Sequence, residues 1–379
     1  MVVDNVIWGA PASGVSALER ELARLRRARS AHASEQGHTV ARASVLNLVV
    51  FATREVHAKR AARTIADLSQ RHPSRAIVVW VDRPGSTATD RLAMHCDLPR
   101  ADGREQVSCE QILVRAPGDA GARLASAVIP LLLPDLPVFL WWTDTPPFDA
   151  PHFDAMLELA DRFIIDSADF ARPELSLKRV REVCARGSGR YGVTDFNWTR
   201  LTPWRDLVSA FFDVPAWRPY LDSITGVRVG FTVDADGREV HPSQALLLVG
   251  WLASRLGWLA AQSLAPSEAG GMLFSMTRGD GTRIPVRVRP RFERGLEEGD
   301  LSGLRIQATR DGKLAEFVVK RAAGNAHVTT SVIIDGSLVT ERVMPLSAPR
   351  VGDLLGEELT IVASDHVYED ALAALVALS

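Results

Sequence analysis

Polar, basic and aromatic side chains are concentrated in the segment 195–205, DFNWTRLTPWR, ahead of a helix expected over 206–212. The guanidinium groups of Arg200 and Arg205 could hold a carboxylate or a phosphate through paired hydrogen bonds. The alternative is that the two tryptophans anchor a loop that Thr202 connects to the helix as its cap. The sequence favours neither interpretation. The candidate partner-binding residues of this segment are Asn197, Trp198, Arg200, Trp204 and Arg205.

A second unusual segment, 131–147, reads LLLPDLPVFLWWTDTPP and places Trp141 and Trp142 near the expected carboxyl end of a strand. Ligands of open α/β sheets bind at that edge. Because adjacent strand residues point to opposite faces, both rings can be buried only if helices cover both faces of the sheet. Burial is the simpler interpretation, and a contact of Trp141 and Trp142 with a ligand or a protein partner is the alternative.

Arginines alternate with apolar residues over 283–289, which predicts a strand with one apolar face and one basic face. A basic sheet face exposed to water is the simpler interpretation. The same charges could instead hold an acidic surface of a partner protein, and Arg287 and Arg289 are then candidate contact residues.

Short motifs for cofactors give no site. A phosphate-binding loop needs a lysine followed by serine or threonine, and no lysine of this sequence is. Gly187, Gly189 and Gly192 match the spacing GxGxxG, but a helical pattern precedes them where a dinucleotide site needs a strand. They are expected to form a glycine-rich segment at the C-terminal end of a helix, and no cofactor is expected.

His95, Cys96 and Cys109 form a local cluster of soft metal ligands, but zinc needs a fourth ligand, so no metal is expected. Redox sensing through Cys96 and Cys109 is one interpretation of these thiols, and two small buried side chains are the other. Three cysteines without a CxxC pair indicate a reducing compartment. The motifs GxSxG and HExxH do not occur, and no catalytic residue is assigned.

The composition limits the class of protein further. The chain has 379 residues and a formal net charge of −2, which suggests two domains and argues against general nucleic-acid binding. The most apolar stretch, 128–142, is short for a membrane span and contains three prolines. The first residues show no signal-peptide pattern. We therefore expect a cytoplasmic protein with neither nucleic-acid nor membrane partners.

The hydrophobic pattern predicts an α/β domain over 41–218, after an N-terminal helix and a linker in 1–40. The linker is expected over 30–38, and a single helix over 121–133. A strand, a helix and a strand are expected in turn at 45–51, 55–71 and 76–81. This order is a βαβ unit and favours a doubly wound, mostly parallel sheet.

The pattern changes after residue 218, where Asp-Gly pairs recur between alternating segments. An Asp-Gly pair in that setting is a strong signal for a β-hairpin. One hairpin is expected from 304–310 and 314–321, and another from 328–334 and 337–344. With helices over 243–259 and 368–378, the segment 219–379 is predicted to be an α+β domain with an antiparallel meander.

Five blocks of the sequence resemble the OpcA family, the glucose-6-phosphate dehydrogenase assembly or activator proteins of actinobacteria and cyanobacteria. The blocks are RHPSRAIVV at 71–79, CEQILVRA at 109–116, LLLPDLPVFLWW at 131–142, NWTRLTPWRDLV at 197–208 and LLLVGWLASRLGW at 246–258. They run in order from about residue 40 to about residue 260.

The resemblance implies a protein that is not itself an enzyme. Members of the family bind glucose-6-phosphate dehydrogenase, promote its active oligomeric state, and so favour the oxidative pentose phosphate pathway and NADPH supply. The family supplies no catalytic residues to transfer. The alternative is an enzyme or sensor that binds a sugar phosphate or a nucleotide in the strand-end crevice of the α/β domain.

Overall fold

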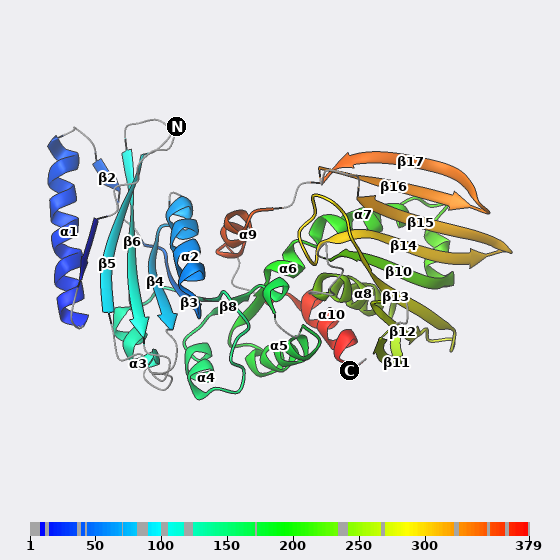
Figure 1. Cartoon of the computed structure of the whole chain (residues 1–379), viewed down its shortest axis with the longest axis horizontal. Helices are drawn as coiled ribbons and strands as arrows, with labels where there is room; N and C mark the ends of the chain where they lie inside the picture. The colour runs from blue at the N-terminus through cyan, green and yellow to red at the C-terminus, as the bar shows by residue number, and fades with distance from the viewer. Residues whose placement is uncertain are drawn as a thin grey trace. The chain divides into compact units, whose positions relative to one another are not determined.

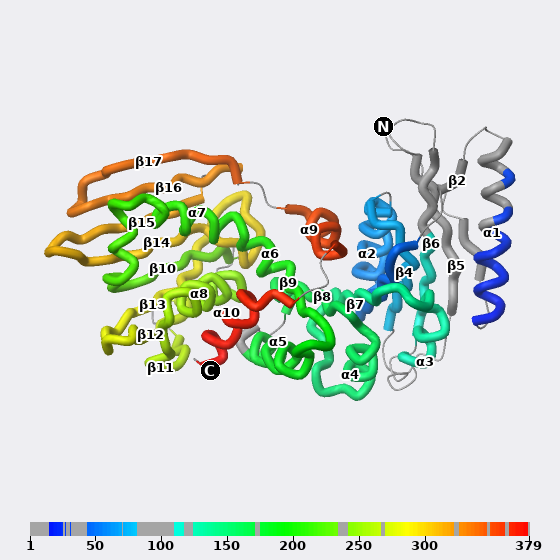
Figure 2. The backbone as a smooth tube through the Cα atoms, turned by 180° about the vertical axis from the view of Figure 1, so that it is seen from behind, coloured from blue at the N-terminus to red at the C-terminus, as the bar shows by residue number. Residues whose placement is uncertain are grey.

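The computed structural model describes the backbone of residues 8–11, 15–35, 39–41, 44–69, 71–81, 90–99, 105–116, 124–170, 173–233, 242–266, 270–321, 326–346, 349–360 and 364–377. The chain divides into two compact units, each made of discontinuous segments (Figures 1 and 2). Unit 1 contains 1–166, 187–194 and 350–364, and unit 2 contains 167–186, 195–349 and 365–379. The domain boundaries expected at 40/41 and 218/219 stay a prediction.

In the described residues, unit 1 is built on a sheet with strand order β1-β5-β6-β4-β3-β7-β8-β9, and β2 pairs with β6. The pairs from β6 to β8 are parallel, whereas β5 and β1 are added antiparallel at one side. The strands are β1 (Trp8–Pro11), β2 (Thr39–Ala41), β3 (Leu46–Ala52), β4 (Ser74–Val81), β5 (Asp90–Pro99), β6 (Glu105–Ala116), β7 (Val138–Trp142), β8 (Arg162–Ile165) and β9 (Gly192–Asp195). Every residue of β3 is buried, as expected for a central parallel strand covered on both faces.

The helical elements of unit 1 are α1 (Val15–Glu35), α2 (Glu55–Leu68), α3 (Leu124–Val128), the 3₁₀ turn Ile129–Leu131, α4 (Pro151–Leu157) and α9 (Val351–Glu358). The helix α1 continues through most of the expected linker 30–38, so that prediction is wrong. The single helix expected over 121–133 is also wrong, because Pro130 ends α3 in a 3₁₀ turn. A buried ion pair, Arg162 Nη2 to Glu358 Oε2 at 2.7 Å, attaches α9 to the sheet.

Unit 2 contains a separate sheet, whose order within the described part of the chain is β11-β12-β13-β10-β14-β15-β16-β17. Only the β10–β13 pair is parallel in that path. The strands are β10 (Ile224–Thr232), β11 (Leu259–Pro266), β12 (Met272–Thr277), β13 (Arg283–Arg291), β14 (Leu301–Arg310), β15 (Lys313–Arg321), β16 (His327–Ile334) and β17 (Ser337–Pro345). The protein is thus a mixed α/β structure with one largely parallel and one mostly antiparallel sheet.

Both hairpins expected from the Asp-Gly pairs are confirmed as β14–β15 and β16–β17. Their turn residues have positive φ at both positions, 52° and 75° at Asp311 and Gly312, and 48° and 79° at Asp335 and Gly336. Such turns match the twist of the paired strands, and aspartate and glycine tolerate the left-handed conformation.

Helices pack on one face of the unit 2 sheet (Figure 1). The helical elements are Ser167–Asp169 (3₁₀), α5 (Pro173–Gly187), α6 (Phe196–Thr199), α7 (Thr202–Phe212), Arg218–Ser223 (3₁₀), α8 (Ser243–Leu256) and α10 (His366–Val376). The buried Phe317 of β15, for example, contacts the rings of Phe211 and Phe212 of α7. The face of the sheet opposite to Phe317 is called the outer face below.

The start of α7 differs from the expectation. Thr202 is the first helical residue, and the cap position falls on Leu201, which has no side-chain cap. The hydroxyl of Thr202 instead accepts a hydrogen bond from Arg205 Nη2 at 2.8 Å. The predicted threonine cap is therefore wrong, because the helix begins one residue earlier than the cap requires.

Candidate functional site

Basic residues form two neighbouring rows across the outer face of the unit 2 sheet. Strand pairing places the members of each row opposite one another on β13, β10, β14 and β15. The first row contains Arg287, Arg228 and Arg305. The second row contains Arg289, Gly230, Gly303 and Lys320. These side chains share the outer face because the intervening residues, Val286, Val288 and Val229 among them, are buried in the core.

Two glycines occupy the centre of the second row and leave it without side chains. A Cβ atom on Gly230 would lie 2.5 Å from Ser302 Oγ, and one on Gly303 would lie 3.0 Å from the carbonyl oxygen of Val319. The pairing also shifts register between Gly230 and Phe231, which forms a β-bulge beside Ser302. Glycine and a bulge inside a strand are typical of a place where another group approaches the backbone.

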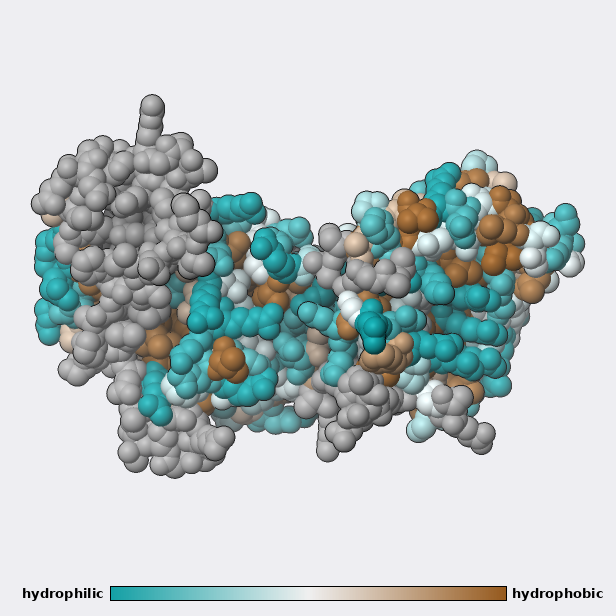
Figure 3. Space-filling view, turned by 45° about the horizontal axis from the view of Figure 1, so that its top comes forward, coloured by the Kyte–Doolittle hydropathy of each residue, from teal (hydrophilic) through white to brown (hydrophobic). Residues whose placement is uncertain are grey.

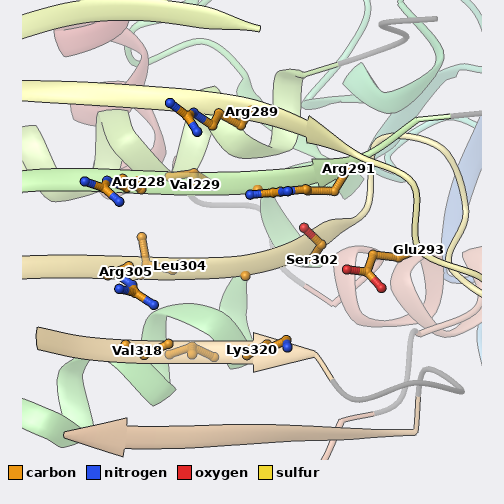
Figure 4. A pocket seen from close by; sticks show the side chains of 13 residues that line it. Arg228, Val229, Arg289, Arg291, Glu293, Ser302, Leu304, Arg305, Val318 and Lys320 are labelled. Atoms are coloured by element: carbon orange, nitrogen blue, oxygen red, sulfur yellow. The ribbon is translucent and has the colours of Figure 1, made fainter. Parts of the chain in front are cut away.

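The two glycines form the floor of a groove of about 470 Å³, here called the basic groove (Figure 4). Its walls come from β13, β10, β14 and β15. The lining residues with side chains on the groove include Arg228, Arg289, Arg291, Glu293, Ser302, Arg305 and Lys320. The volume lies within the range of small-molecule sites, about 300–1,000 Å³.

Most of the positive charge in the basic groove is not neutralised by the residues that the structure describes. Arg305 Nη1 lies 3.1 Å from Glu316 Oε1 and forms an ion pair with it. The other cations of the lining, Arg228, Arg289, Arg291 and Lys320, form no ion pair with any residue that the structure describes. Glu293 is the one acidic residue of the lining. The groove is therefore an anion-attracting site on geometric and electrostatic grounds.

The segment 195–205 lies in a buried hydrogen-bond network of unit 2. Asp195 Oδ1 accepts hydrogen bonds from the backbone N–H groups of Ser167 and Asn197, both at 2.9 Å. Its other carboxylate oxygen accepts from the hydroxyl of Tyr368 at 3.1 Å. Burial, followed by the charge of Asp195, raises the pKa of Tyr368 well above its usual value, so this hydroxyl remains a donor. The network stabilises the junction of α6 with α10.

Asn197 connects the same network to the basic groove. Its Nδ2 donates to Ser167 Oγ at 3.1 Å and to Ser243 Oγ at 3.0 Å. Its Oδ1 accepts from Gln244 Nε2 at 3.1 Å, and Gln244 Oε1 accepts from the backbone N–H of Leu301 at 3.0 Å. Leu301 is the first residue of β14 and directly precedes Ser302 of the groove. A chain of hydrogen bonds thus runs from Asn197 through Gln244 to the residue next to Ser302.

The aromatic part of the segment is also engaged within unit 2. Trp198 Nε1 donates to Asp365 Oδ2 at 2.7 Å, and the guanidinium of Arg205 lies 3.7 Å from the centroid of the Trp198 ring. Burial is the main cause that lowers the pKa of Arg205. Trp198 and Trp204 are 3% and 2% exposed. These contacts favour the anchoring interpretation of the segment.

Trp141 and Trp142 are both buried in unit 1, at 5% and 2% exposure. The Trp142 ring stacks on Phe51 with centroids 4.7 Å apart and meets the edge of Phe153 at 5.5 Å. The interpretation that both rings are buried is confirmed. In this conformation neither Trp141 nor Trp142 offers a surface to a partner.

Within unit 2, the residues expected to bind a partner lie in different environments. Asn197, Trp198 and Trp204 are buried in unit 2, and Arg200 and Arg205 are half-buried. Arg287 and Arg289 alone of the candidates belong to the rows of the outer face. Partner binding by these residues stays a prediction.

Sequence patterns missed the other half of the basic groove. Arg228, Gly230, Gly303, Arg305 and Lys320 were not expected to act together. One sequence feature could have indicated this site. Both β10 and β14 contain a glycine two positions from an arginine within an alternating segment. The position of β10 between β13 and β14 cannot be read from that signal.

The remaining sequence motifs are located as follows. The helix α5 ends at Gly187, and Gly189 has a φ of 75°, which confirms the expected glycine-rich end of a helix.

Backbone pairing of β5 with β6 sets Cys96 opposite Cys109. The side chains of Cys96, Cys109 and His95 lie outside the described residues. Within the described ranges no group of His, Cys, Asp and Glu is arranged to hold a metal ion. No described helix is long and apolar enough to cross a membrane.

The fold and the groove define a two-unit mixed α/β protein with a basic groove on the sheet of its second unit. Two family models match the chain, the glucose-6-phosphate dehydrogenase subunit N-terminal domain over 65–182 and its C-terminal domain over 191–372. The chain belongs to the OpcA family of glucose-6-phosphate dehydrogenase subunits.

Curated relatives agree with this assignment. The chain is 26% identical to an OxPP cycle protein OpcA of Synechocystis sp., with 76% of this chain and 59% of the relative covered. It is 25% identical to the OpcA protein of Nostoc punctiforme, with 82% of this chain and 66% of the relative covered. The chain thus spans about three fifths to two thirds of the length of these relatives.

Solved structures are more distant. A levoglucosan dehydrogenase in complex with NADH and L-sorbose has 11% identity and a TM-score of 0.46, with 88% of this chain and 97% of that chain covered. An NAD binding oxidoreductase from Klebsiella pneumoniae has 10% identity and a TM-score of 0.43, with 88% and 96% covered.

Proposed function

We propose that this chain is a non-catalytic subunit that binds glucose-6-phosphate dehydrogenase and promotes its active assembly. The match of both subunit domain models, over 65–182 and 191–372, carries the proposal. The names of the curated relatives, OxPP cycle proteins, support a role in the oxidative pentose phosphate pathway and NADPH supply. The alternative of a strand-end ligand site gains no support from those names, and the tryptophans at that edge are buried.

Activation requires only that the chain bind the active form of the enzyme more tightly than the inactive form. The difference in binding free energy then shifts the population of the two forms. A tenfold shift needs a difference of about 1.4 kcal/mol. A single well-packed contact that exists only in the active assembly is enough to supply that difference.

The edge strand β17 is the surface of unit 2 that best suits a protein partner. Leu338, Val339 and Val343 of β17 are 58%, 53% and 64% exposed, and β17 ends the order of the unit 2 sheet. Brown, apolar groups gather at the upper right of the space-filling view, on this unit (Figure 3). Exposed apolar groups on an edge strand mark a place where another chain can pack or pair. We propose the dehydrogenase as the occupant, with Arg287 of the outer face as a charged contact.

The test is a titration of the purified cognate dehydrogenase with this chain. Activity at a substrate concentration below KM and the size of the complex are measured together. A saturable rise in rate with co-elution is expected. No rise and no co-elution at a large molar excess of folded chain would contradict the function.

Variants of the two edge strands then locate the contact. Val343→Asp on β17 is expected to weaken activation at least tenfold, because it places a charge in the apolar contact. Leu259→Asp is the matched control, since Leu259 is 70% exposed on β11, the opposite edge strand. If both variants activate like the original chain, the function stands and the β17 surface is wrong.

A further inference from the structure

The charge of the basic groove defines what it can hold. Five cations line it against the single carboxylate of Glu293. Glu316, which is outside the lining, neutralises Arg305. Among the described residues, three positive charges are therefore uncompensated. A phosphate monoester carries about −1.5 to −2 at pH 7, so two phosphate groups bring about −3 to −4. A ligand with two phosphate groups matches the groove, whereas a single carboxylate leaves most of the charge unpaired.

The shape of the groove agrees with a small ligand. Gly303 leaves the floor without a side chain, and the hydroxyl of Ser302 takes the place that a side chain on Gly230 would fill, so a phosphate can approach the floor between Arg289 and Lys320. Ser302 supplies a hydroxyl beside the floor, and Glu293 supplies an acceptor for a ligand hydroxyl. The described lining residues include no aromatic side chain, so their recognition of a ligand rests on charge and hydrogen bonds rather than on stacking of a base.

We propose that the basic groove binds a small molecule that carries two phosphate groups. Arg228, Arg289, Arg291 and Lys320 hold the phosphates, and the arginines can do so through paired N–H···O hydrogen bonds. The two phosphates belong either to a terminal diphosphate group or to two separate ester positions of a sugar. The proposal does not depend on the function proposed above, because the ligand would bind the chain alone.

The test is isothermal titration calorimetry and thermal unfolding of the full chain at low ionic strength. The probes are inorganic pyrophosphate, ADP and a hexose bisphosphate, with inorganic phosphate and a hexaglutamate peptide for comparison. We expect saturable 1:1 binding of pyrophosphate, at least tenfold tighter than inorganic phosphate, and a rise in Tm. Tighter binding of ADP would indicate a diphosphate group, and tighter binding of the hexose bisphosphate would indicate two separate ester positions. Binding is expected to weaken at high salt and at pH 5, where the phosphates gain protons.

The site is located by charge-removing variants inside and outside the groove. Arg289→Gln combined with Arg291→Gln is expected to weaken pyrophosphate binding about 10- to 100-fold. Arg283→Gln is the control, because Arg283 is an exposed arginine of β13 outside the groove. It is expected to change affinity less than threefold.

Three results would overturn the proposal. One is the absence of heat and thermal shift with all three diphosphate or bisphosphate probes. Another is equal weakening by Arg283→Gln and by the groove variant, which would show diffuse attraction instead of a site. The third is tighter binding of hexaglutamate than of every phosphate probe, which would assign the groove to an acidic protein segment.

Discussion

Gly230 of β10 and Gly303 of β14 lie directly opposite each other, and together they open the floor of the basic groove. Each is held to glycine by a different neighbour, Gly230 by the side chain of Ser302 and Gly303 by the backbone of β15. Arg289 and Lys320 continue the same row on the two flanking strands. The pairing of these four strands thus places the two glycines at the centre of the row and a cation at each end of it.

Replacement of Gly230 by alanine tests this floor. Gly230→Ala is expected to lower the free energy of unfolding by about 1–3 kcal/mol, because the new methyl group would overlap Ser302 Oγ. The additional change Ser302→Ala removes that oxygen, so the double variant is expected to recover most of the loss. Urea unfolding of the two single variants and the double variant measures the coupling.

Gly226→Ala is the matched control for that experiment. Gly226 lies on the same strand, and its nearest neighbour would be 3.6 Å from an added Cβ, which is ordinary contact. It is expected to be tolerated. A loss as large as that of Gly230→Ala, or no recovery in the double variant, would show that the overlap with Ser302 is not the cause.

A change at Glu316 tests the charge of the groove. Glu316 accepts hydrogen bonds from Arg305 at 3.1 and 3.2 Å and from Gln307 at 2.8 Å. Glu316→Gln leaves the shape similar and frees the charge of Arg305. We therefore expect pyrophosphate to bind severalfold more tightly, as measured by calorimetry. Unchanged or weaker binding would mean that Arg305 does not contribute to the site.

Arg342→Gln is a suitable control for Glu316→Gln. Arg342 is exposed on β17 outside the groove, and its replacement changes the net charge of the chain in the opposite direction. Its effect on affinity is expected to be small. A change as large as that of Glu316→Gln would point to long-range attraction.

Local patterns were sufficient for most elements of the fold. The Asp-Gly pairs gave both hairpins of unit 2, since the turn itself requires residues that adopt positive φ. The apolar run at β3 gave a buried central strand. The extent of two helices was predicted less accurately. The helix α1 extends through a segment of polar residues, and Pro130 divides a segment that was expected to form one helix.

The site could be predicted only in part. The alternation at Arg287 and Arg289 indicated a basic strand face. In the sheet, however, β10 lies between β13 and β14, although β14 follows β13 directly in sequence and β10 comes much earlier. Pairing over such distances depends on the whole fold, so the contribution of Arg228 and Lys320 was not visible. Trp198 and Arg205 were expected as partner contacts, which stays a prediction, and in the structure they contact each other.

Asn197→Ala tests the link between the buried network and the groove. The change leaves Ser167 Oγ, Ser243 Oγ and Gln244 Nε2 without their Asn197 partner. We expect a loss of about 1–3 kcal/mol in the free energy of unfolding. Pyrophosphate affinity is expected to fall as well, because Gln244 no longer holds the N–H of Leu301 in a fixed position.

Thr202→Ala is the control in the same segment, since Thr202 is exposed and its hydroxyl accepts a hydrogen bond from Arg205. It is expected to cost less than about 0.5 kcal/mol and to leave pyrophosphate binding unchanged. If Asn197→Ala lowers stability but leaves affinity intact, Asn197 is structural without positioning the groove.

Cys184 gives the protein a specific response to alkaline pH. Burial raises the pKa of its thiol to about 12, from an ordinary value of 9.0. The unfolded chain therefore loses this proton from about pH 9, whereas the folded chain keeps it, so the free energy of unfolding falls as the pH rises through that window. Tyr368 acts in the same direction, because burial also raises its pKa.

The measurement is the urea midpoint at pH 8 and pH 10 for the original chain and for Cys184→Ala. We expect the midpoint to fall between the two pH values, and to fall less in Cys184→Ala, in which one of the two groups is absent. In a Cys96→Ser/Cys109→Ser background, a thiol reagent at pH 8 should label Cys184 only as fast as the chain unfolds. Two results together would contradict this prediction: rapid labelling of Cys184 in the folded chain, and an equal fall of the urea midpoint in the original chain and in Cys184→Ala. They would show that the thiol is accessible in the folded protein.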